Sequence, residues 1–297
     1  MTLKAQALAS KQYTSIIRLF LHSDVATDDA LINVPRIKKQ LAAEFDFAKE
    51  GFITIDKYNY SKNDVLEELG RADFIDRLHY HKRIWENKAV LSILEDNELR
   101  LYELRDQIKT FANDTKFDAF FSPYFAVPFN YISRNYLNDK RLSDVGAWLL
   151  FEDFLQGEDR EEAFRAIRVF LEDNIRIIKN INGENYKIIR PQIEHWLKPG
   201  GSDLLNNLPH EFYGAKNDMV LYLINLTVRI QKTNRQDCKN ISTELTCVTD
   251  INSEYEELIM NNHQAFTQTR YSSSNKNNYW WLIWLIIMLF KLLSGGC

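Results

Sequence analysis

An arginine and a histidine stand five residues apart in Arg190-Pro-Gln-Ile-Glu-His195, and they are the strongest candidates for chemistry in this chain. On one α-helix of 3.6 residues per turn, five residues correspond to about 140° around the axis. That separation is compatible with both side chains acting on one substrate. Residues 185–197 are expected to form the helix that carries both side chains.

This six-residue pattern resembles the R-x(4–6)-H signature of HEPN-type ribonucleases, which are all-helical proteins. The resemblance implies that Arg190 and His195 would be the catalytic pair of an RNA-cleaving site. RNA cleavage is accordingly one alternative function for the chain.

Two further histidines, His79 and His81, stand two residues apart on an expected helix and so point to different faces. Asp76 and His79 share a face, but a dinuclear carboxylate site in a helical bundle needs a second such pair. The sequence contains neither G-x-x-x-x-G-K-[ST] nor G-x-G-x-x-G, the two loops that commonly hold nucleotides. We expect surface or hydrogen-bonded histidines, no bound metal and no cofactor.

The composition fits a folded chain whose overall charge would not attract anionic partners. Its 297 residues are 45% hydrophobic, which is ample for a core. The formal net charge is −4 and the isoelectric point is about 5.9, so we expect no nucleic acid partner. The three cysteines form neither a C-x-x-C pair nor a disulfide framework, which suits a reducing compartment; they are Cys238, Cys247 and Cys297.

Hydrophobic periodicity predicts a mainly α-helical domain over residues 1–266. Pro35 suits the first turn of one helix, and Ser61 is a good N-cap for another, with Asp64 three residues later. Residues 52–58 alternate briefly and are the best strand candidate, although one strand makes no sheet. Further helical patterns cover residues 84–94, 99–111, 159–181, 218–230 and 253–266.

Residues 117–137 are rich in aromatic side chains around Pro123 and Pro128. Two prolines five residues apart exclude a straight helix there. Two interpretations are open for this stretch. We favour a core between two helical layers, and the alternative is a surface that lines a ligand pocket or receives another chain.

Within residues 159–181, apolar side chains recur every three or four positions around one asparagine, Asn174. Coiled-coil seams use such an asparagine to fix register or partner number, so self-association through this face is one interpretation. Packing within the same chain is favoured, because the pattern is short. The Pro/Gly-rich residues 198–203 then mark the best internal domain boundary.

The last hydrophobic run, residues 279–293, predicts a single C-terminal transmembrane helix. Its aliphatic residues together favour insertion by about 3–5 kcal/mol, and Trp280, Trp281 and Trp284 suit the headgroup layer. Lys291 lies near the end, where its stem can extend outward. Fifteen residues give roughly 22 Å against a hydrocarbon core of about 30 Å, so an interfacial helix and a buried core helix are the alternatives.

Residues 267–278 form a polar tether between the body and this anchor. Arg270 and Lys276 precede the anchor and favour a cytoplasmic body by the positive-inside rule. Residues 1–21 show no secretory signal. We therefore expect a single-pass, tail-anchored membrane protein whose N-terminal body is cytoplasmic.

These features favour an adaptor or scaffold that holds a protein-binding body at a membrane, and they give no active-site signature that would favour an enzyme. A membrane-acting oligomeric effector of the defence or cell-death type is the main alternative, because the anchor is short and rich in tryptophan. The expected partners are the lipid bilayer, another protein and, for the effector, further copies of the chain.

Overall fold

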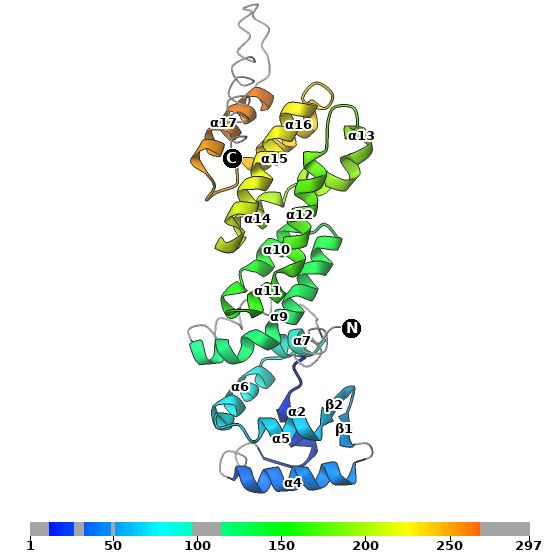
Figure 1. Cartoon of the computed structure of the whole chain (residues 1–297), viewed down its shortest axis with the longest axis vertical. Coiled ribbons are helices and arrows are strands. Elements are labelled where there is room, and N and C mark those ends of the chain that lie inside the picture. Colours follow the sequence, from blue (N-terminus) through cyan, green and yellow to red (C-terminus); the bar gives the residue numbers. More distant parts are fainter. Residues whose placement is uncertain (1–11, 27–32, 49–50, 97–113, 268–297) are drawn as a thin grey trace, which may run out of the picture.

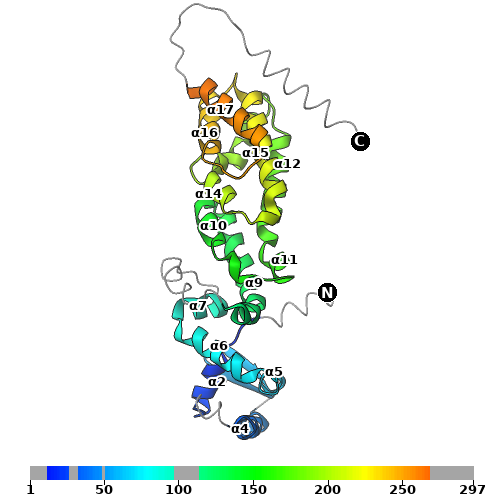
Figure 2. The same cartoon turned by 90° about the vertical axis from the view of Figure 1, so that its left-hand side faces the viewer.

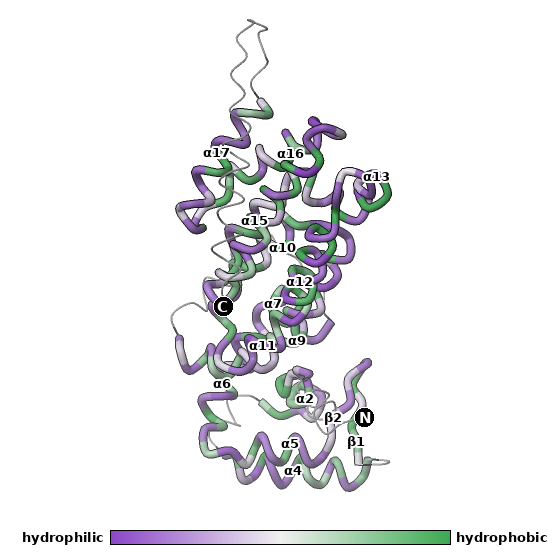
Figure 3. Tube along the Cα trace, turned by 45° about the horizontal axis from the view of Figure 1, so that its top comes forward, coloured by the Kyte–Doolittle hydropathy of each residue, from purple (hydrophilic) through white to green (hydrophobic). Residues whose placement is uncertain are grey.

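The computed structural model describes residues 12–26, 33–48, 51–96 and 114–267. These residues are mainly α-helical, as predicted, and the helices stack along one long axis (Figures 1 and 2). Hydrophobic and hydrophilic residues alternate along the helices (Figure 3), so each helix can bury one face and expose another. The result is an elongated body with its N-terminal helices at one end and helix α17 at the other.

The predicted anchor lies outside the described residues, together with Trp280, Trp281, Trp284 and Lys291. In the part of the chain that the structure describes, no helix has the length and apolar character that a membrane span requires. Helix α17 (Ser253–Thr267) includes the first residue of the predicted tether, and the remainder of the tether also lies outside the described ranges.

The N-terminal module, which comprises the described residues from Ile16 to Glu86, has a hydrophobic cluster of its own around Leu19, Phe20 and Leu41. Its elements are α2 (Ile16–His22), α4 (Val34–Phe47), β1 (Phe52–Ile55), β2 (Tyr58–Ser61), α5 (Lys62–Glu68) and α6 (Phe74–Glu86). Pro35 lies in the first turn of α4, and the Ser61 hydroxyl accepts the Asp64 N–H at 3.1 Å, both as predicted. α6 contributes Leu78 to this cluster and Ile84 to the larger one above it.

Residues 52–58, predicted as one strand, contain β1, a turn and the first residue of β2, so the expectation of a single strand was wrong. The chain turns at Asp56, whose φ of +55° lies in the left-handed region that Asp tolerates better than most residues. Thr54 Oγ1 donates to Asn59 Oδ1 across the strands at 2.7 Å. Packing of the hairpin on the N-terminal cluster gives it the buried face that an isolated pair of strands lacks.

The helix predicted over residues 84–94 is interrupted at Asn87, which has extended backbone angles. The Asn87 carboxamide accepts the Val90 N–H at 3.1 Å and so caps a new helix, α7 (Lys88–Asp96). The next predicted helix, residues 99–111, lies outside the described residues.

Helix α9 (Thr115–Asn138) runs unbroken through Pro123 and Pro128. Each proline costs a helix interior about 3 kcal/mol. Burying one phenylalanine side chain returns about 1.5–3 kcal/mol, and this helix buries five of them. The helix therefore continues through both prolines, which had been expected to exclude a straight helix, and the interpretation of this stretch as part of the core is confirmed; its buried phenylalanines are Phe117, Phe120, Phe121, Phe125 and Phe129.

The main body packs its helices around one large hydrophobic cluster that α9 enters from below. Its central helix, α15, is buried against α12, α16 and α17, as the apolar pattern of residues 218–230 predicted. The elements that follow α9 are α10 (Leu142–Leu149), η2 (Glu152–Phe154), α11 (Asp159–Ala163), α12 (Arg165–Lys179), α13 (Tyr186–Ile189), η3 (Arg190–Trp196), α14 (Gly201–Asn206), η4 (His210–Phe212), α15 (Tyr213–Ile230), α16 (Arg235–Leu245) and α17.

The single helix predicted over residues 159–181 is two helices that meet at Phe164. The Phe164 ring is fully buried, and Asn130 of α9 accepts the Ala166 N–H at 2.9 Å. That hydrogen bond satisfies one of the free N–H groups that a new helix start creates. A side chain far away in sequence therefore fixes the break.

The predicted break at residues 198–203 is present, and Gly200 adopts a φ of +118° that suits glycine. Residues on both sides of this break, such as Trp196 and Leu204, belong to the same hydrophobic cluster. A division of the chain into domains there stays a prediction.

Gly146 of α10 permits a close approach to α14, because a Cβ at this position would meet the Asp203 carbonyl oxygen at 2.6 Å. We predict that Gly146→Ala lowers the free energy of unfolding by about 2 kcal/mol, because backbone of a packed helix must move. Gly214→Ala in α15 is the matched control, since its Cβ would meet no atom within 4 Å. Urea unfolding followed by circular dichroism measures both, and equal effects would contradict the prediction.

Candidate functional site

Arg190 begins the 3-10 helix η3 and forms a two-pronged ion pair with Asp237 of α16. Its Nε and one terminal nitrogen lie 2.7 and 3.0 Å from the two carboxylate oxygens. The Tyr186 hydroxyl at 2.5 Å and the Asn234 amide at 2.6 Å also donate to Asp237. Burial alone would raise the pKa of Asp237, but the hydrogen bonds from Arg190 and Tyr186 lower it. This cluster joins α13 and η3 to the start of α16.

His195 is buried five residues later and binds a different partner. Its Nε2 lies 2.8 Å from Asn174 Oδ1, and Trp196 Nε1 donates to the same oxygen at 2.9 Å. The Asn174 amide nitrogen donates to the Phe170 carbonyl, so His195 Nε2 is the donor in its own bond. Burial, assisted by the positive charge of Lys140, lowers the pKa of His195 to about 4. The imidazole is therefore neutral at pH 7.

The expected α-helix over residues 185–197 was wrong, because α13 ends at Ile189 and the tighter η3 takes over. Pro191 has no N–H for an α-helical hydrogen bond, which suits this change. Arg190 belongs to the Asp237 cluster and His195 to the Asn174 cluster, and these two clusters share no residue among those named above. Catalysis by this pair stays a prediction that the geometry does not strengthen.

Asn174 lies inside the chain, so the favoured interpretation of its apolar seam is confirmed. It is 4% exposed, and its neighbours Ile167, Leu171 and Ile178 are fully buried. Its carboxamide holds η3 against α12, through bonds to two side chains of η3. The seam is thus occupied by intramolecular packing and leaves no asparagine face for a second copy.

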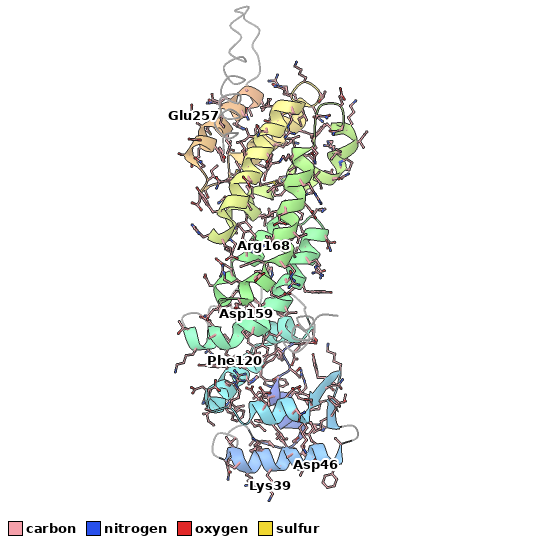
Figure 4. The ribbon with its side chains drawn as sticks, in the orientation of Figure 1. Lys39, Asp46, Phe120, Asp159, Arg168 and Glu257 are labelled. Carbon is pink, nitrogen blue, oxygen red and sulfur yellow. The ribbon has the colours of Figure 1, made fainter. Side chains whose placement is uncertain are left out.

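A buried polar network that the sequence did not predict joins the N-terminal module to the main body. The Tyr13 hydroxyl lies 2.9 Å from His81 Nδ1, and His81 Nε2 lies 3.3 Å from Glu68 Oε1. Arg77 donates to both oxygens of Glu68, at 2.6 and 2.9 Å. Phe120 of α9, labelled in Figure 4, packs its ring 5.0 Å from the His81 ring. His81 is therefore a hydrogen-bonded histidine, as expected.

The order tyrosine, histidine, glutamate could relay a proton, but the electrostatics favour a fixed structural network. Burial raises the pKa of Tyr13 well above 10 and lowers the pKa of His81, so both groups are neutral at pH 7. Burial opposes ionisation of Glu68, yet hydrogen bonds from His81 and Arg77 hold its pKa at about 2. Tyr13 and His81 are 1% and 4% exposed, so neither side chain is accessible from solvent.

A second network beside it fixes the same N-terminal segment. Glu95 of α7 accepts the Ser15 N–H at 3.1 Å and binds Arg18 through both oxygens, at 2.8 and 2.6 Å. The Tyr60 hydroxyl donates to the Ser15 carbonyl at 2.9 Å. The Arg18 guanidinium lies 4.0 Å from the centre of the Tyr58 ring. The segment before α2 is therefore bonded to the hairpin on one side and to α7 on the other.

The surface feature that stands out on the N-terminal module is its apolar tip, which we define as Phe47 and Phe52. Phe47, the last residue of α4, is 91% exposed, and Phe52, the first residue of β1, is 51% exposed. Figure 4 labels Lys39 and Asp46 of α4 at this end of the molecule and Glu257 of α17 at the other. Aromatic side chains are enriched at protein interfaces, so these two exposed phenylalanines are candidates for an interaction site.

Across the described ranges, no three His, Cys, Asp or Glu side chains are grouped so as to hold a metal ion. Cys238 is buried, Cys247 is exposed, and both are free thiols. Comparison with known proteins finds no matching family model, no matching curated protein and no matching solved structure.

His195 provides a prediction about acid stability. Its pKa is about 4 in the folded chain, against about 6.5 when unfolded, so acid protonates the unfolded state first. The neutral imidazole contributes fully to the free energy of unfolding above pH 6.5. About 3 kcal/mol of this contribution is lost as the pH falls to 4. We expect His195→Gln to flatten the decline of the unfolding midpoint between pH 6.5 and 4. The exposed His210→Gln is the control, and identical pH profiles would contradict the prediction.

The Asp237 cluster provides a second prediction. Arg190→Ala leaves the Asp237 carboxylate, whose side chain is 3% exposed, without its counter-charge. We expect a loss of roughly 2–3 kcal/mol in the free energy of unfolding. The double variant Arg190→Ala, Asp237→Asn should lose less than the single variant, because no buried charge remains. If the double variant lost as much free energy of unfolding as the single variant, or more, the ion pair would not be what stabilises this junction.

Proposed function

We propose that the chain is a tail-anchored helical adaptor, which residues 279–293 hold in a bilayer and whose N-terminal module binds another protein. The observation that carries this proposal is that helix α17 and the N-terminal module lie at opposite ends of the elongated body (Figure 1). Helix α17, which leads towards the hydrophobic run, ends at one extreme of the elongated body, and the N-terminal module forms the opposite extreme (Figures 1 and 2). Such a body would present its N-terminal module away from the membrane.

The apolar tip supports a protein partner. Covering a phenylalanine side chain stabilises a complex by about 1.5–3 kcal/mol, and Phe47 is almost completely available for this. Aromatic side chains are enriched among the residues that dominate binding energy. The partner that suits this tip is an apolar segment of another protein, because two phenyl rings offer contact area and no charge.

The membrane part of the proposal rests on the sequence of residues 279–293. Its aliphatic residues favour insertion by about 3–5 kcal/mol, and its tryptophans suit the headgroup layer. The oligomeric effector remains the alternative, but the asparagine seam that would have favoured it is used inside the chain. The adaptor is therefore the function with more support.

The test uses the full chain with a photo-crosslinking residue in place of exposed Lys39, in membranes of the cells that produce it. We expect Ile286→Arg to release the chain from the membrane fraction, since a central arginine costs about 2.5–3.5 kcal/mol. We expect Phe47→Ser with Phe52→Ser to keep the chain in that fraction and reduce its cross-linked partner at least about tenfold.

Val169→Ser is the matched control, because Val169 is a half-exposed apolar residue of α12 outside the tip. An anchor of the same topology but greater length should preserve the cross-link of an adaptor and abolish the activity of an effector. A wild-type chain found among soluble proteins, or a cross-link that is indifferent to the two phenylalanines, would contradict the proposal.

A further inference from the structure

Hydrogen bonds gather six elements at the end of the body where α17 finishes. Arg229 of α15 donates to the carbonyls of Lys179 and Ile181 at the end of α12, at 2.9 and 2.6 Å. Arg235 at the start of α16 donates to the Ala265 carbonyl of α17 at 3.1 Å. The Asp237 cluster adds α13 and η3 to the same end. Segments 176–190, 229–239 and the end of α17 are therefore neighbours.

This end of the molecule is strongly basic, although the whole chain has a net charge of −4. Residues 176–190 and 229–239 contain eight Lys and Arg and two Asp and Glu, and one of those acids, Asp237, is buried against Arg190. We call the exposed cations here the basic end. They are Lys179, Lys187, Lys232, Arg235 and Lys239; Arg176 is also exposed but is paired with Asp173, and we leave it out.

An apolar side chain lies among these cations. Ile188 of α13 is 79% exposed and follows Lys187 directly. An exposed isoleucine next to lysines suits a membrane surface. The lysine can bind a lipid phosphate while the isoleucine contacts the acyl chains below. The carboxylates of α17 lie away from the basic end: Glu254, Glu256 and Glu257 are in its first turns, and its last turns carry no carboxylate.

The basic end lies close to the predicted point of membrane entry. Residues 268–278 join Thr267 to the hydrophobic run, and eleven residues span at most roughly 40 Å. Among the described ends of the body, this one is therefore the end that the anchor would keep beside the bilayer surface.

We propose that the basic end docks on anionic lipid headgroups, so that the body stands on the membrane instead of hanging free. This inference rests on the proposed tail anchor and adds a second, electrostatic contact. Each lysine near an anionic surface strengthens attraction, and the effect decays within a Debye length of about 8–10 Å. The anchor would keep the basic end near the bilayer, and binding to anionic lipid would fix the orientation of the body.

The test reconstitutes the full chain into vesicles of phosphatidylcholine alone or with 30% phosphatidylglycerol. A fluorophore on Gln236→Cys, in a Cys247→Ser, Cys297→Ser background, reports quenching by headgroup-labelled lipid, while Cys238 stays buried. We expect strong quenching only with the anionic lipid. We expect the variant Lys187→Gln, Lys232→Gln, Lys239→Gln to lower the equilibrium constant for docking by on the order of 100-fold. High salt should lower it in the same way.

The matched control removes three exposed lysines elsewhere, with Lys39→Gln, Lys88→Gln and Lys116→Gln, and should leave quenching unchanged. Equal quenching in both lipid mixtures, or no effect of the first triple variant, would overturn the docking proposal while leaving the anchor intact. Failure to float with neutral vesicles would instead refute the anchor. A single-stranded oligonucleotide bound in the same lysine-dependent way, with no lipid preference, would also overturn it.

Discussion

The packing of the α9 phenylalanines is the interaction on which the rest of the molecule depends. Their rings form a continuous column, with centroids 4.9 Å apart for Phe121 and Phe125 and 4.8 Å for Phe129 and Trp148. The column passes from the N-terminal module into the main body, because Phe120 also contacts His81 and the later rings contact α10. Without it, two prolines would break the helix that connects the two ends, and their separation would carry no functional meaning.

Buried polar groups then determine how the elements sit on this column. Asn174, Asp237, Glu68 and Glu95 are each deeply or largely buried, and each is satisfied by side chains or N–H groups from other elements. An unpaired buried carboxylate would cost several kcal/mol, so these groups tolerate few alternative arrangements. Residues with the chemistry of an active site are used here as structural links. That use explains how Arg190 and His195 can match a catalytic pattern and still lie in separate clusters.

The sequence predicted what depends on local pattern and missed what depends on distant partners. The cap at Ser61, the central apolar helix and the polar last helix follow from neighbouring residues, and all are present. The break at Phe164 was missed because it depends on Asn130, 36 residues from Ala166. The break at Asn87 is a local signal that was overlooked, since the Asn87 side chain caps Val90 three residues later. The network around His81 was equally hidden, because Tyr13 lies 68 residues away and no spacing rule joins them. Phe47 lies outside the buried stripe of α4, which is Ile37, Leu41 and Phe45, so the helical period alone could have indicated its exposure.

Net charge describes the whole chain and does not show where its charges lie. A value of −4 averages over an elongated molecule, and an average is informative about partners only when charges are mixed evenly. Here the fold brings together two basic segments that are about forty residues apart, through Arg229, Arg235 and Arg190, whose own bonds are made to backbone and to Asp237. Arg190 and Arg229 thus hold together the surface that displays the lysines, and Arg235 both binds α17 and remains exposed. A screened electrostatic contact reaches only about 10 Å, so this local field, and not the sum over the chain, decides what that end attracts.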